Sequence, residues 1–140
     1  MFLIVALGFS SYQSIRLNFY RYDDESMPYV YAPTAREFLQ MISKVREISA
    51  TIGTREDTPI AVVYSDYWPM PWYLPDYTRV SYHGQLTPTT DPIVIGSDGQ
   101  EPLLKQQLVD YVRVGSWKQR NGLQPVVYVR RELAGVLGVP

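Results

Sequence analysis

The sequence contains no cysteine and a single histidine, His83. The lack of cysteine excludes a disulfide framework, a thiolate zinc site and a cysteine nucleophile, and a single histidine excludes metal sites built on a histidine pair. The 13 basic and 14 acidic side chains give a formal net charge of −1. Because nucleic-acid-binding proteins carry a clear basic excess, we expect no nucleic-acid partner.

Motifs for nucleotide cofactors are also missing. No glycine-rich dinucleotide fingerprint and no phosphate-binding loop follows an expected strand, so we expect no cofactor and no metal. Ser97 and Asp98, followed by Gly99, lie between an expected strand and an expected helix, where α/β folds bind ligands, although ordinary turn chemistry produces the same pattern. His83 is the base that a Ser-His-Asp triad would require, yet no nucleophile-elbow pattern surrounds Ser65 or Ser97.

A long hydrophobic run is the third missing feature. Residues 1–15 carry no charged side chain, but serines and a glutamine dilute their second half, and a membrane-spanning helix needs about 20 apolar residues. Residues 12–22 then combine aromatics with arginines, as segments at a membrane surface do. The residues themselves leave two interpretations open: a strand or helix buried in the domain, or the end of a transmembrane helix that begins before this chain.

The length of 140 residues corresponds to one domain. Residues 23–33 are polar at their start and predict a linker. Thr34 and Glu37 then have the spacing of a capping box, in which each side chain pairs with the other residue's backbone amide. Apolar side chains recur at steps of three and four through residues 35–52, which predicts a helix, with Gly53 as its C-terminal stop.

Short apolar runs predict strands at residues 60–64, 79–82, 92–96, 111–117 and 126–130. Pro71 and Pro102 suit the first turns of two further helices. The apolar side expected for the second of these helices consists of Leu103, Leu104, Leu108 and Tyr111. The order predicts an α/β fold over residues 34–134: a small layered Rossmann-like domain with a mostly parallel sheet, an antiparallel C-terminal hairpin and helices on its faces. Residues 135–140 are expected to form a loose tail.

The most unusual segment is residues 65–75, which hold four aromatics and three prolines. Prolines restrict the backbone, so the rings are presented with little loss of entropy, and flat rings on a rigid loop stack on sugars, bases or a lipid interface. The alternative is a set of aromatics that closes the hydrophobic core. The candidates for a ligand or interface surface are Asp66, Tyr67, Trp68, Trp72 and Tyr73.

The sequence also resembles a known family in two runs. They are residues 28–34 and, after the expected helix, Asp66-Tyr67-Trp68-Pro69-Met70-Pro71-Trp72-Tyr73-Leu74. Together with the strand at residues 59–63 they are similar to the C-terminal region of polytopic membrane proteins of the dolichyl-phosphate-mannose protein mannosyltransferase family, glycosyltransferase family 39. The resemblance is closest to the archaeal and bacterial group described as flippase-activity-associated, and it covers roughly residues 1–100.

This resemblance implies a function and a location. Residues 1–22 would be the end of a transmembrane helix and its exit from the membrane, and the α/β domain would lie on the extracytoplasmic side. The family's catalytic residues lie in its membrane region, so no catalytic residue is carried over. The implied role is a non-catalytic accessory domain of a glycosyltransferase-like protein, with the transmembrane part, the membrane surface or a polyprenyl-phosphate-linked sugar as partner. The residues alone also allow a free-standing binding module for a sugar or a nucleotide.

Overall fold

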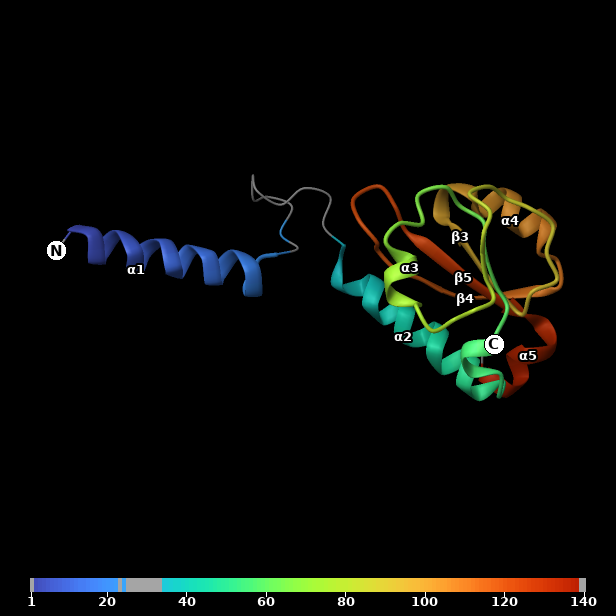
Figure 1. Cartoon of the computed structure of the whole chain (residues 1–140). Helices are drawn as coiled ribbons and strands as arrows, with labels where there is room; N and C mark the ends of the chain where they lie inside the picture. The colour runs from blue at the N-terminus through green and yellow to red at the C-terminus, as the bar shows by residue number, and fades with distance from the viewer. Residues whose placement is uncertain (1, 23, 25–33, 139–140) are drawn as a thin grey trace. The chain divides into compact units, whose positions relative to one another are not determined.

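The computed structural model describes residues 2–22, 24 and 34–138 (Figure 1). The chain divides into two compact units, Met1–Thr34 and Ala35–Pro140. Apart from Asp24, the expected linker at residues 23–33 lies outside the described residues. The second unit contains the sheet and therefore the α/β fold.

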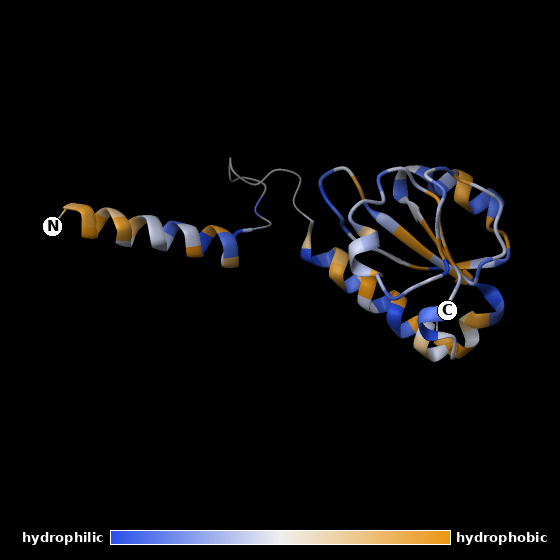
Figure 2. Cartoon of the chain, viewed as in Figure 1, coloured by the Kyte–Doolittle hydropathy of each residue, from blue (hydrophilic) through white to orange (hydrophobic). Residues whose placement is uncertain are grey.

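The first unit is helical. Helix α1 (Phe2–Ile15) continues into a π-helical turn, η1 (Arg16–Tyr20). No residue of α1 is buried, and its exposed large apolar side chains are Phe2, Leu3, Ile4, Val5, Leu7, Phe9, Tyr12 and Ile15. The hydrophobic residues gather in the first turns of the helix (Figure 2). Among the residues that the structure describes, no helix combines the length and the apolarity that crossing a membrane requires.

The second unit is built on a five-stranded sheet with the order β2-β1-β3-β5-β4. Strands β1 (Ile60–Val62), β2 (Val80–Tyr82) and β3 (Ile93–Ser97) run parallel, and Ile60 pairs with Val80 on one side and with Ile93 on the other. Strands β5 (Pro125–Arg130) and β4 (Tyr111–Ser116) complete the sheet as an antiparallel hairpin. The predicted fold class, a mostly parallel sheet with an antiparallel C-terminal hairpin, is confirmed.

Helices cover the two faces of this sheet. On one face, α2 (Arg36–Thr51) and α3 (Met70–Tyr73) pack against alternate residues of the strands, such as Ile60 and Ile93. On the other face, α4 (Glu101–Gln107) packs Leu104 against the intervening residues, such as Ala61 and Val94. Successive strand residues point to opposite faces, so the central strands must be apolar throughout. This is why their continuous apolar runs were recognisable in the sequence.

The start of α2 differs from the sequence-based expectation. The N-cap of α2 is Ala35 without a side-chain hydrogen bond, and Glu37 Oε2 instead accepts the backbone N–H of Lys118 at 3.1 Å, so the predicted capping box at Thr34 is wrong. A capping box does occur, between Ser97 and Gln100 of the 3₁₀ turn η3 (Asp98–Gln100) that precedes α4. Glu37 therefore bonds to the loop between β4 and β5 instead of capping α2.

Two further expectations fail. Leu103, expected on the apolar side of α4, is 54% exposed, and Tyr111 is the first residue of β4 rather than part of the helix. Residues 135–137, expected as a loose tail, belong to α5 (Arg131–Leu137), which buries Ala134 and packs Leu137 against the core. The glycine that ends the helix is Gly138, at a φ of +63°, a conformation that glycine adopts without strain.

Candidate functional site

The aromatic-proline segment begins where β1 ends. Residues 65–75 leave the carboxyl end of this parallel strand, and in their middle the chain forms the short helix α3. Met70 and Leu74 are buried in the core and hold α3 against the sheet. In parallel sheets this edge is where ligands characteristically bind. The segment is therefore part of the folded core and also supplies surface at a favourable position.

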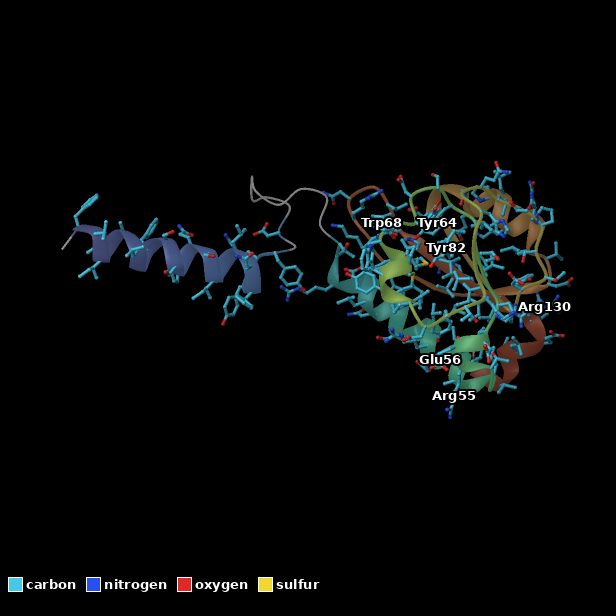
Figure 3. All side chains as sticks on the ribbon, in the orientation of Figure 1. Arg55, Glu56, Tyr64, Trp68, Tyr82 and Arg130 are labelled. Atoms are coloured by element: carbon cyan, nitrogen blue, oxygen red, sulfur yellow. The ribbon has the colours of Figure 1, made fainter. Side chains whose placement is uncertain are left out.

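Two tryptophans of this segment are exposed. Trp68, labelled in Figure 3, and Trp72 are 58% and 72% exposed. Their rings contact each other edge to face, with centroids 6.3 Å apart and planes at 83°. We call these two residues the tryptophan pair. Monomeric proteins rarely leave large aromatic side chains together in solvent unless they contact a partner. The pair is the strongest candidate for a binding surface among the described residues.

The tyrosines of the same segment are directed elsewhere. Tyr67 packs on Tyr82 of β2, with ring centroids 4.8 Å apart, and Tyr73 packs edge to face on Phe38 of α2 at 5.4 Å. Both tyrosines are half-buried against the main core cluster. The sequence left an aromatic surface and a closed core as alternatives. The structure divides the segment between them: the tryptophans face solvent, and the tyrosines complete the core.

A buried glutamine fixes the backbone of this segment. Gln119, in the loop between β4 and β5, is only 1% exposed. Its Nε2 donates to the carbonyl oxygens of Asp66 and Trp68 at 3.0 and 2.8 Å, and its Oε1 accepts the hydroxyl of Tyr64 at 2.8 Å. Burial in turn raises the pKa of the Tyr64 phenol, which stays a donor at neutral pH. Sequence reasoning missed Gln119 because nothing near it in the chain indicates its distant partners.

An ion pair holds the side chain of Asp66, two residues before Trp68 in the chain. Asp66 Oδ1 is 2.9 Å from Arg120 Nη2, and the Asp66 side chain is 67% exposed. Arg120 follows Gln119 directly, so neighbouring residues of one loop hold both the backbone and the side chain of Asp66. A carboxylate is thus kept at the surface two residues before Trp68. Exposed pairs of this kind contribute little to stability.

The weaker candidates have structural roles. The backbone N–H of His83 extends the pairing of β2 by donating to the carbonyl of Val62, and within the described residues the exposed imidazole has no serine or carboxylate partner. Ser97 forms the capping box with Gln100, and Asp98 Oδ1 accepts the N–H of Gly99. Within the described residues, no hydrogen bond joins any of these three side chains to Trp68 or Trp72. Turn chemistry thus accounts for Ser97 and Asp98.

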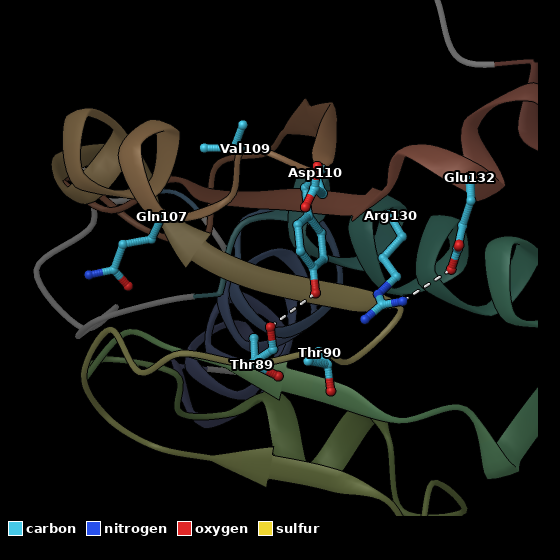
Figure 4. Close-up of a pocket in the computed structure, with 8 residues that line it drawn as sticks. Thr89, Thr90, Gln107, Val109, Asp110, Arg130 and Glu132 are labelled. Atoms are coloured by element: carbon cyan, nitrogen blue, oxygen red, sulfur yellow. Dashed lines mark hydrogen bonds and ion pairs between the residues drawn. The ribbon is translucent and has the colours of Figure 1, made fainter.

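A cleft lies at the other end of the strands, near the start of β3 (Figure 4). It has a volume of about 390 Å³, and its polar lining includes Thr89, Thr90, Asp110, Tyr111, Arg130 and Glu132. The Tyr111 hydroxyl donates to the carbonyl of Asp91 at 2.8 Å, and Arg130 pairs with Glu132 at 3.2 Å. Its charged groups are therefore largely engaged with the protein. No group of three or more metal-ligating side chains occurs among the described residues.

Tyr82, which packs on Tyr67, makes the domain less stable at alkaline pH. Burial, with a smaller contribution from Tyr67, raises the pKa of Tyr82 from 10.0 to about 12. Between these values the unfolded chain has already lost the proton that the folded domain retains, so stability falls as the pH rises through that window. We expect Tyr82→Phe to show a shallower fall in the free energy of unfolding in urea melts. An equally steep fall in both proteins would contradict the assignment to Tyr82.

Comparison of the chain with protein-family models, with curated proteins and with solved structures gives no match. The function of the domain therefore has to be inferred from its own residues.

Proposed function

We propose that this chain is a non-catalytic accessory domain of a membrane glycosyltransferase-like protein that uses polyprenyl-phosphate-linked sugars, on the extracytoplasmic side of the membrane. The observation that carries the proposal is the exposure of Trp68 and Trp72 on a backbone that Gln119 holds in place. Rigid exposed indoles suit a sugar ring or the membrane interface, because each has an apolar body and a polar N–H. The similarity of residues 66–74 to the mannosyltransferase-like family supports this choice of partner.

The first unit supports membrane association. The first half of α1 is apolar on all sides, and a helix of this kind is stable in water only when another apolar phase covers it. The following turn adds Arg16 and the exposed aromatics Phe19 and Tyr20, a combination typical of the headgroup region. In the proposed arrangement α1 anchors the chain and the tryptophan pair contacts the lipid-linked sugar.

Vesicle flotation tests this function directly. The full chain is mixed with phosphatidylcholine vesicles that either contain or lack dolichyl-phosphate mannose. We expect binding to plain vesicles through α1, and a several-fold larger bound fraction when the glycolipid is present. Trp72→Ala should remove the glycolipid-dependent increase and keep the basal binding, because Trp72 is exposed and its loss leaves the core intact.

The matched control is Leu103→Ala, which removes an exposed apolar side chain from α4 and should change neither component. An increase of the same size in Trp72→Ala would refute the role of the tryptophan pair, and the absence of vesicle binding would refute the membrane location. Saturable binding of a free sugar without any vesicle binding would favour the free-standing binding module instead.

A further inference from the structure

The first unit contains an arginine without a counter-charge. Arg16 follows α1 directly and is the first charged residue of the chain. Its side chain is half-buried, yet it forms no ion pair and no hydrogen bond with any residue that the structure describes. A charged group that is partly withdrawn from water is stabilised by an anion that replaces the lost hydration. Arg16 therefore offers a place for a negatively charged partner.

Arg16 lies in a surface groove with aromatic and apolar walls. The groove is lined by Tyr12, Ile15, Arg16, Tyr20 and Arg21. Three of these residues recur at steps of four, the spacing that places side chains close to one face of a helix. In the π-helical turn η1 the backbone N–H of Arg21 donates to the carbonyl of Arg16 at 2.9 Å, so the two arginines lie one turn apart. The groove thus combines two cations with aromatic rings.

The two arginines differ in their surroundings. Arg21 Nε is 3.4 Å from Asp24 Oδ2, so the charge of Arg21 is balanced within the protein. Residues 1–22 contain no acidic side chain, and Arg16 has no such partner among the described residues. An anion that enters the groove therefore meets the uncompensated charge of Arg16 and forms its charge-assisted hydrogen bonds there.

The position of Arg16 matches the level of lipid phosphates. Helix α1 has no charged residue and buries none of its side chains, so in an apolar phase its charge-free length ends at Arg16. The exposed rings of Phe19 and Tyr20 follow, and such rings characteristically lie at the headgroups. A guanidinium donates two parallel hydrogen bonds to a phosphate, and the exposed Tyr12 supplies a further hydroxyl donor.

Resting on the membrane association in the proposed function, we infer that Arg16 binds the phosphate of an anionic phospholipid. Tyr12 and Tyr20 flank this phosphate, and the apolar part of the lipid lies along α1. Arg21 remains paired with Asp24 and takes no part. The site adds a preference for anionic membranes to the apolar attraction of α1.

The test measures the partition of the full chain between buffer and vesicles of two compositions. One is phosphatidylcholine, whose choline balances the phosphate; the other also contains phosphatidylglycerol, whose phosphate charge is unbalanced. The compared quantity is the ratio of the two partition coefficients, in which a change in apolar insertion cancels. We expect the wild type to prefer the anionic vesicles, and Arg16→Gln to lower the ratio about fivefold, the effect of one cationic side chain at an anionic surface.

Arg21→Gln is the matched control, because it removes the same charge from the same groove. Arg21 is already paired with Asp24, so the ratio should stay within about twofold of the wild-type value. Equal falls in the two variants would overturn the inference, since they would show attraction by net charge alone. A wild type without preference for phosphatidylglycerol would overturn it as well.

Inorganic phosphate, added at constant ionic strength, separates a lipid phosphate from a free one. It should leave the chain on the anionic vesicles, because a free phosphate lacks the apolar contact with α1. Release of the chain would overturn the assignment to a lipid.

This inference and the proposed function fail in different ways. Equal falls for Arg16→Gln and Arg21→Gln, with the glycolipid-dependent flotation intact, would refute only the phosphate site. If the glycolipid has no effect but only Arg16→Gln loses the preference for phosphatidylglycerol, the proposed contact with the lipid-linked sugar is refuted and the phosphate site stands.

Discussion

Gln119→Leu is expected to lower the free energy of unfolding by about 3 kcal/mol, because it removes three hydrogen bonds and leaves the buried Tyr64 hydroxyl without a partner. For a domain of this size the change corresponds to a fall in Tm of about 15 °C. Urea and thermal melts of the full chain, followed by circular dichroism, measure both. The same variant should broaden or shift the Trp68 indole N–H signal, since Trp68 loses the bond that holds its carbonyl.

Gln124→Leu is the matched control for this prediction. Gln124 lies in the same loop, but its side chain is exposed and has no hydrogen bond among the described residues. We expect a change within about 0.5 kcal/mol for this variant. A small effect at Gln119 as well would mean that the loop does not hold the aromatic-proline segment, and it would contradict a rigid tryptophan pair.

The second large effect is expected for Phe38→Ala, at about 3–5 kcal/mol of unfolding free energy. Phe38 is fully buried on α2, and its ring packs edge to face on Tyr73 at the end of α3. Truncation leaves a cavity beneath that tyrosine and removes a contact between the two helices. Denaturant unfolding gives the stability, and the near-ultraviolet circular dichroism reports the packing of the aromatic side chains.

Leu39→Ala separates this effect from a general sensitivity of α2. Leu39 is the next residue in the same helix but is 43% exposed, so its truncation should change stability by no more than about 0.5 kcal/mol. Equal losses for the two variants would contradict the packing of Phe38 described above.

The fold was largely predictable because its signals are local. The buried apolar residues of α2, such as Met41 and Val45, recur at steps of three and four along one continuous stretch of the sequence. The runs that became β1 and β3 are apolar at every position because both faces of the sheet are covered. The cap of α2 was predicted wrongly because one long-range hydrogen bond, from the Lys118 backbone N–H to Glu37, replaces the local cap.

The candidate site was predictable only in part. The sequence identified the aromatic-proline segment from its composition, but composition assigns the same surface role to Tyr67 and Tyr73 as to the tryptophans. Their separation depends on Tyr82 and Phe38, residues of other elements that happen to face the tyrosines. Burial of a side chain is decided by its neighbours in space.

The sequence by itself determined the order of helices and strands from α2 to β5, the parallel centre of the sheet and the position of the aromatic-proline segment, since each follows from the local pattern of apolar residues and prolines. Only the tertiary structure decided which rings reach solvent and what holds them there. The bonds of Gln119 join residues 51 to 55 positions apart, and no local pattern carries information about partners at that distance. The exposure of the tryptophan pair is therefore a product of packing, whereas the elements that support it are a product of the chain's local chemistry.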